Sequence, residues 1–174
     1  MRRYRTPPWL VATGVALIYT SVDVVVPLAL STLTRHVGWG DGPSVANLAG
    51  VPVLVAGIAI ILWSGARHAT QWRSLDWRVL KYDRDHLLTP DYLVTDGPYA
   101  YTRNPLYVGD LLMWAGWAIL LGSPAVLAGA LALGVGLQAG VRLEERGLLR
   151  QFGDDWKKYA RTTPRFIGWR RPAA

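Results

Sequence analysis

The sequence predicts an all-α, polytopic membrane protein with about four transmembrane helices. Three observations predict this class: apolar residues make up 51% of the 174 positions, they gather in long runs, and basic residues lie between the runs. A helix that crosses a bilayer needs roughly 20 predominantly apolar residues. The chain contains no Cys, which excludes disulfides, thiolate metal sites and cysteine nucleophiles.

The apolar runs predict spans over residues 9–33, 45–64, 105–121 and 124–141. The first run is too long for the apolar region of a signal peptide, so we expect it to be retained as a helix. Only "GSP", residues 122–124, separates the last two spans, and so short a link predicts an antiparallel helical hairpin. We therefore expect a single integral-membrane domain over residues 1–174.

Charge divides the connections between the spans into two kinds. The N-terminus, the connector 65–104 and the tail 142–174 are basic, whereas the connection near residues 34–44 is almost uncharged. By the positive-inside rule, the two N-terminal spans (1–64) and the hairpin (105–141) leave both termini cytoplasmic, and we expect the plasma (inner) membrane. The net charge of +7 suits anionic lipid headgroups, and no nucleic-acid partner is expected.

The tail 142–174 shows helical periodicity in its apolar residues. Glu145, Leu149, Phe152 and Trp156 share one helical face, which should pack inward. This pattern predicts a cytoplasmic amphipathic helix that continues the fourth span or bends at Gly153. The tail is expected to form part of a ligand site.

The first candidate site is the stretch "GPYAYTRNPLY", residues 97–107, directly before an apolar run. Pro105 suits the first turn of a helix and Asn104 can cap it, so a helix N-terminus is expected there. Such an N-terminus binds anions, and Arg103 adds a fixed positive charge. The stretch also supplies aromatic faces and hydroxyl groups, from Tyr99, Tyr101 and Tyr107. The alternative is that these side chains are interfacial membrane anchors.

Carboxylates at the ends of and within the apolar runs form the second set of candidates. Glu144 and Glu145 are adjacent where an apolar helix meets the cytoplasm, and Glu145 could pair with Arg142, Arg103 or a cationic ligand. The alternative is a solvated helix end with i,i+3 and i,i+4 ion pairs. Asp110, and more weakly Asp23, are candidates because carboxylates inside predicted spans are often functional.

Two further patterns favour structure over chemistry. Gly136 and Gly140 form a GxxxG pair, which predicts close helix packing within the chain or in a homo-oligomer. The three histidines are scattered without the spacing of metal ligands, so no metal site is expected.

The order of these elements resembles the integral-membrane methyltransferases related to isoprenylcysteine carboxyl methyltransferase and phospholipid (phosphatidylethanolamine) N-methyltransferase. Their pattern runs Gly-x-Tyr, Arg-His-Pro-x-Tyr, Glu-Glu and Phe/Tyr-Gly-x-x-Tyr/Trp, and the resemblance covers roughly residues 90–168. The matching residues here are Gly97, Tyr99, Arg103, Pro105, Tyr107, Glu144, Glu145, Phe152, Gly153 and Trp156. Asn104 departs from the pattern, because many members have His there.

The resemblance implies S-adenosyl-L-methionine as cofactor and a membrane-embedded lipophilic acceptor, either a lipid amine or an isoprenoid carboxylate. The implied cofactor-binding residues are Gly97, Tyr99, Arg103, Asn104, Pro105, Tyr107, Glu144 and Glu145. The catalytic candidates are Glu145, Asp110 and Arg142. Glu145 or Asp110 would accept a proton from an amine acceptor, whereas a carboxylate acceptor would need no base.

Two other functions remain open at the level of sequence. A nicotinamide-dependent membrane reductase has a similar layout of polar loops, although the Glu-Glu pair disfavours binding of extra phosphates. A non-enzymatic membrane scaffold would use the aromatic and basic loops only as anchors.

Overall fold

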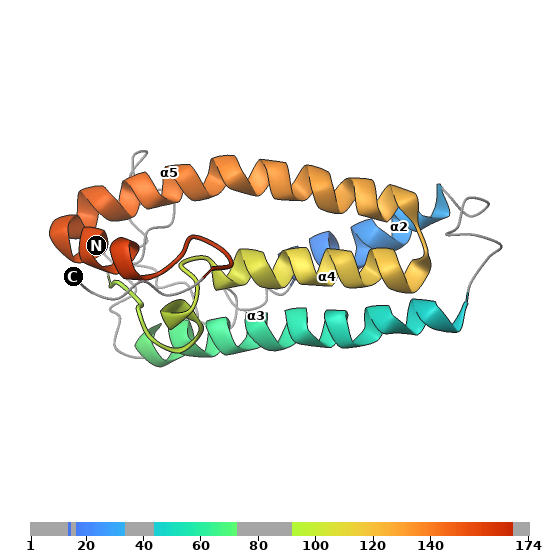
Figure 1. Cartoon of the computed structure of the whole chain (residues 1–174), viewed down its shortest axis with the longest axis horizontal. Coiled ribbons are helices and arrows are strands. Elements are labelled where there is room, and N and C mark those ends of the chain that lie inside the picture. Colours follow the sequence, from blue (N-terminus) through green and yellow to red (C-terminus); the bar gives the residue numbers. More distant parts are fainter. Residues whose placement is uncertain (1–13, 15–16, 34–43, 73–91, 169–174) are drawn as a thin grey trace, which may run out of the picture. The chain divides into compact units, whose positions relative to one another are not determined.

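The computed structural model describes residues 14, 17–33, 44–72 and 92–168 (Figure 1). Across these residues every regular element is a helix and no strand is present. The predicted start of the first span, residues 73–91 of the connector 65–104 and the last residues of the tail lie outside the described residues. The helices are η1 (Ser21–Val25), α2 (Val26–Thr32), η2 (Val45–Ala49), α3 (Gly50–Trp72), η4 (Gly97–Ala100), α4 (Pro105–Leu121) and α5 (Pro124–Thr162).

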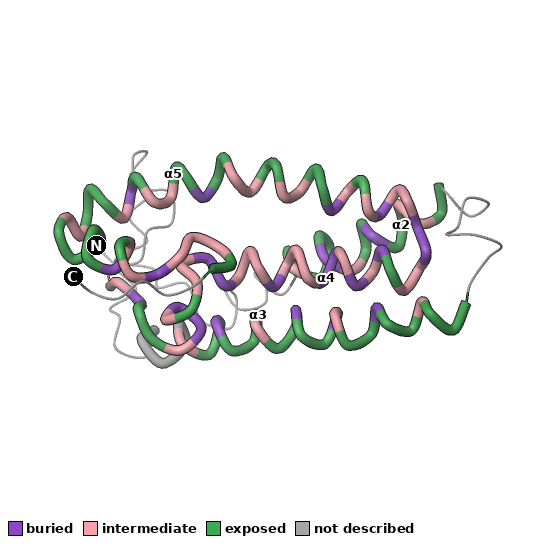
Figure 2. The backbone as a smooth tube through the Cα atoms, in the orientation of Figure 1, coloured by how far each residue is buried: buried purple, intermediate pink, exposed green. Residues whose placement is uncertain are grey.

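Two of the described helices are long and apolar enough to cross a membrane, over Val45–Arg67 and Pro124–Thr162. Only 17% of the most apolar stretch of each is buried, so neither helix resembles the core helix of a soluble protein. Figure 2 shows the exposed residues along α3 and α5. The helices Leu17–Thr32 and Pro105–Leu121 are also apolar but shorter. The chain is thus a helical membrane protein, and the number of four spans stays a prediction.

The chain divides into two units, each containing parts of α3, α4 and α5. The first unit comprises Met1–Ile58 and Asp110–Gly134, and the second comprises Ala59–Gly109 and Val135–Ala174.

The core of the first unit lies between the end of α4 and the beginning of α5. Trp114 and Ala118 from α4 pack against Val126 and Ala130 from α5, and all four are buried. The turn between the helices has Gly122 at φ 55°, and the Ser123 hydroxyl accepts a hydrogen bond of 3.3 Å from the Val126 N–H. A left-handed glycine ends one helix and a serine caps the next, so the predicted hairpin has a local cause.

Two glycines allow α3 and α4 to approach closely within this unit. A Cβ atom on Gly50 would lie 2.5 Å from the Gly116 carbonyl oxygen, and one on Gly116 would lie 2.7 Å from the Leu54 backbone nitrogen. By contrast, a Cβ on Gly136 or Gly140 would meet nothing within 4 Å among the described residues. The predicted close packing within the chain at the GxxxG pair is therefore wrong there, and Gly50 and Gly116 have that role instead.

Asp23 is buried in the first unit, with 2% of its surface exposed. Its carboxylate accepts a hydrogen bond of 3.1 Å from Trp114 Nε1, and its main-chain carbonyl accepts one of 2.7 Å from Trp117 Nε1. The residue lies in the π-helical turn η1, so two indole N–H groups meet at a local irregularity of the helix. These contacts favour a structural role for Asp23.

We expect Asp23→Val to lower the free energy of unfolding by about 1–3 kcal/mol, because the buried Trp114 N–H loses its acceptor. Asp23→Asn keeps an oxygen at the same place and should cost less. Thermal unfolding of the purified variants in detergent measures both effects. Equal stability of Asp23→Val and the parent would contradict the assignment.

Candidate cofactor site

The second unit contains the loop that leads into α4, and Gly97 fixes how that loop begins. Gly97 has φ 59°, a left-handed conformation that favours glycine. A Cβ atom there would also lie 2.8 Å from Arg67 Nε of α3. Arg67 pairs with the neighbouring Asp96, which ties the loop to α3. Gly97 therefore acts through backbone shape and close packing.

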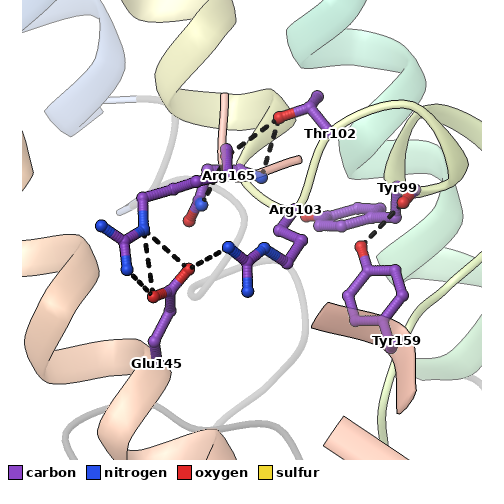
Figure 3. Close-up of polar contacts among 7 residues, drawn as sticks. Tyr99, Thr102, Arg103, Glu145, Tyr159 and Arg165 are labelled. Carbon is purple, nitrogen blue, oxygen red and sulfur yellow. Dashed lines mark hydrogen bonds and ion pairs between the residues drawn. The ribbon is translucent and has the colours of Figure 1, made fainter. Parts of the chain in front are cut away.

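The two tyrosines predicted to contact the cofactor have different environments. Tyr99 is buried, and its carbonyl accepts a hydrogen bond of 2.7 Å from the Tyr159 hydroxyl of α5 (Figure 3). Burial also raises the pKa of Tyr159 above its usual value, so this phenol remains a donor. Because its ring is buried, Tyr99 does not present the open stacking face that we predicted. Tyr107 is half-buried, and its hydroxyl donates to Glu144 Oε2 at 3.0 Å.

The segment that follows α5 is hydrogen-bonded along the loop before α4. The Arg103 N–H donates to the Pro164 carbonyl at 2.9 Å, and the Arg165 carbonyl accepts from Thr102 Oγ1 at 3.1 Å. Asn104 Nδ2 donates to the same Arg165 carbonyl at 2.8 Å. These three bonds hold residues 102–104 against residues 164–165.

Asn104 occupies the capping position of α4 in a way that differs from the prediction. Its main-chain carbonyl accepts from the Val108 N–H at 3.1 Å, as a capping residue does, but its side chain turns to the Arg165 carbonyl. Asn104 is 7% exposed and Pro105 is fully buried. Both residues shape the helix start, and neither presents an open surface to a ligand.

Glu145 of α5 is the centre of the polar contacts in this unit (Figure 3). Arg165 Nε lies 3.1 Å from each carboxylate oxygen, and Arg103 Nη2 lies 3.4 Å from Oε1. The side chain of Glu145 is 12% exposed, so two guanidinium groups neutralise a largely buried carboxylate. The hydrogen bond to Glu145 raises the pKa of Arg165.

The guanidinium group of Arg103 contacts two side chains, and one of its N–H donors has no partner among the described residues. Its guanidinium carbon lies 5.5 Å from the centroid of the Trp156 ring, a cation–π contact, and Glu145 lies on another side. Burial lowers the pKa of Arg103 from its usual value, and Glu145 opposes that shift. The Nε atom of Arg103 is buried and has no hydrogen-bond partner among the described residues. A ligand oxygen is the kind of acceptor that this N–H lacks.

A pocket of about 310 Å³ opens beside these side chains. Its lining residues are Arg142, Glu145, Arg146, Leu149, Trp156 and Arg165. Ligand sites of small molecules begin at about this volume. Leu149 is 40% exposed rather than packed inward as predicted, whereas Trp156 of the same predicted face is buried.

The structure thus brings together most of the predicted site residues and identifies some that were missed. Arg103, Tyr107, Glu144 and Glu145 meet within the second unit, and Arg142 lines the adjoining pocket. Asp110 belongs to the first unit, so it is not among the residues that meet in the second unit. Arg165 was missed, although the charge of Glu145 and the proline before Arg165 were available signals.

The chain matches one family model, described as phospholipid methyltransferase, over residues 46–155. This match covers more than half of the chain and includes the loop 97–107 and the Glu144–Glu145 pair. No solved structure matches.

Three curated proteins are similar to the chain over part of their length. Protein-S-isoprenylcysteine O-methyltransferase of Schizosaccharomyces pombe is 38% identical over 85 residues, which is 48% of this chain and 34% of that protein. Methanethiol S-methyltransferase 1 of Bradyrhizobium diazoefficiens is 32% identical over 83 residues, 48% of this chain and 28% of that protein. Cobalt-zinc-cadmium resistance protein CzcN of Cupriavidus metallidurans is 44% identical over 76 residues, 43% of this chain and 35% of that protein. The chain therefore spans about a third of the length of these relatives.

Proposed function

Because this chain belongs to the phospholipid methyltransferase family, we propose that it transfers a methyl group from S-adenosyl-L-methionine to a lipophilic acceptor in the membrane. The observation that carries the proposal is the meeting of two distant polar segments. Arg103 pairs with Glu145 and Tyr107 with Glu144, although about 40 residues separate the partners. Buried charges need partners, and a pocket with convergent polar groups is the usual setting of a ligand site.

The donor set suits the amino-acid part of the proposed cofactor. The buried Nε–H of Arg103 lacks an acceptor, which a carboxylate would supply. Glu144, whose hydrogen bond from Tyr107 leaves lone pairs free, is the candidate for an ammonium group. When bound, S-adenosyl-L-methionine supplies a methyl group on a positively charged sulfur.

The remaining residues of the site position those that touch the cofactor. Glu145 holds Arg103 through its carboxylate, while Gly97, Asn104 and Pro105 shape the loop. Because Arg165 and Arg103 occupy its oxygens, we assign Glu145 to positioning rather than to proton transfer. Positioning is the main contribution expected from the protein in an in-line displacement at carbon. Asp110 remains the sequence-based candidate for accepting a proton.

For the methyl acceptor we propose only a class of molecule, and for the protein a location in the membrane. The names of two relatives specify an isoprenylcysteine and methanethiol, which differ in size and polarity. We propose an acceptor that reaches the site from the bilayer, with both termini in the cytoplasm of a plasma (inner) membrane protein. Family membership disfavours the reductase and scaffold alternatives.

We expect the purified protein in lipid nanodiscs to bind S-adenosylhomocysteine and not a nicotinamide dinucleotide, because Arg103 lacks an acceptor that a carboxylate would supply and the Glu144–Glu145 pair disfavours additional phosphates. Isothermal titration calorimetry with each compound measures this. Titration of heat-denatured protein serves as the control for binding to lipid. Absence of S-adenosylhomocysteine binding in nanodiscs and in several detergents would overturn the proposed function.

A further inference from the structure

The pocket beside Glu145 has an excess of positive charge. Three of its lining side chains are arginines and one is a carboxylate. That carboxylate is already paired with Arg165 of the pocket and with Arg103 next to it. Arg142 and Arg146 therefore add two cations for which the pocket holds no counter-charge.

Arg142 and Arg146 lie one helical turn apart on α5, and both line the pocket. Like charges at i and i+4 are mildly destabilising on a helix. Neither residue has a hydrogen bond or ion pair among the described residues, in contrast to Arg67, Arg103 and Arg165. A pair of unopposed guanidinium groups on one side of a pocket is suited to a carboxylate or phosphate group, which accepts paired N–H bonds.

The rest of the pocket wall is apolar. Leu149 and Trp156 line it beside the arginines, and Leu149 is 40% exposed. Arg142 and Arg146 are exposed as well, whereas Trp156 is buried, so the wall combines accessible cations with a buried indole. The combination suits an amphiphile, with an anionic group at the arginines and a hydrocarbon part against Leu149 and Trp156.

We propose that Arg142 and Arg146 form a subsite that binds an anionic group, carboxylate or phosphate, of the lipophilic methyl acceptor. The inference rests on the proposed function and names the class of acceptor that the site takes. Arg142 thereby acts as a binding residue for the acceptor. An acceptor with only a cationic headgroup would be repelled from this pocket.

The test uses the full chain in a neutral detergent and simple amphiphiles as probes. Decyl phosphate and decanoate carry the predicted group, whereas decanol and decyltrimethylammonium have the same chain without it. Calorimetry should show binding of the two anionic probes only. The double variant Arg142→Gln/Arg146→Gln should lose at least about tenfold in affinity for them, since hydrogen bonds between charged groups are removed.

The matched control is Lys158→Gln/Arg161→Gln, which removes the same charge from exposed positions of α5 outside the pocket. It should bind the anionic probes as the parent does. Equal losses in both double variants would overturn the subsite, because general surface charge would then explain the binding. Equal binding of decanol by the parent would also overturn it.

A parallel titration with S-adenosylhomocysteine separates the two possible sources of the anionic group. Arg142→Gln/Arg146→Gln should change that affinity less than about threefold if the subsite serves the acceptor. A loss of tenfold or more would assign the arginines to the cofactor carboxylate and overturn the proposal. If the parent does not bind S-adenosylhomocysteine at all, the proposed function fails, whatever the amphiphiles do.

Discussion

Replacing Glu145 by glutamine is expected to weaken S-adenosylhomocysteine binding by at least about 100-fold, the largest functional effect predicted for a single substitution. Glutamine has nearly the same shape but no charge, so Arg103 and Arg165 lose their shared counter-ion. Breaking a largely buried ion pair by removing one partner typically costs about 3–5 kcal/mol. Arg103 would then leave the position from which its unpartnered Nε–H meets a ligand.

The matched control is Asp155→Asn, which removes one negative charge from an exposed position on the same helix. Its affinity should equal that of the parent within about twofold, because exposed charges contribute little. Calorimetry measures binding, while size-exclusion chromatography and circular dichroism show that each variant is folded. Normal binding by a folded Glu145→Gln protein would mean that the cofactor site lies elsewhere.

The sequence was sufficient to predict the residues that meet in the second unit, for a physical reason. Arg103 lies just before α4 and Glu145 just after the apolar run 124–141 of α5, where an unpaired charge is costly, so a partner was expected for each. The partnership with Arg165 was not predictable in the same way. It depends on the main-chain bonds that place residues 164–165 along the loop 102–104, and backbone carbonyls have no signature in sequence.

The sequence predicted which residues belong to the site better than it predicted which side chains are buried and which helices pack together. The periodicity placed Leu149 and Trp156 on one inward face, yet only Trp156 is buried, and Gly153, with a left-handed φ of 52°, lies between the two residues. Tyr99 was expected to offer an aromatic face, yet the burial of its ring follows from packing that only the three-dimensional structure reveals. Likewise, GxxxG marks a possible contact, but whether a neighbouring helix lies there is a question of tertiary structure.

Gly50→Ala is expected to give the largest loss of stability, about 3 kcal/mol in the free energy of unfolding, with a midpoint lower by about 6–12 °C. The added Cβ would lie 2.5 Å from the Gly116 carbonyl oxygen and 2.6 Å from the Leu120 backbone nitrogen. Backbone atoms of a helix cannot turn aside as a side chain can, so α3 and α4 must separate within the first unit. Gly50 has φ −66°, which alanine adopts freely, and the whole effect is therefore steric.

Gly65→Ala is the matched control, because it makes the same substitution in the same helix where a Cβ would meet nothing within 4 Å. It should leave stability unchanged or raise it by up to about 1 kcal/mol, since alanine favours a helix over glycine. Thermal unfolding in one detergent compares the two variants directly. If the Gly50→Ala and Gly65→Ala variants unfold at the same temperature, the close approach of α3 to α4 is not required for stability. If only Gly50→Ala is destabilised, the close approach of α3 and α4 at Gly50 and Gly116 is required for the stability of the first unit.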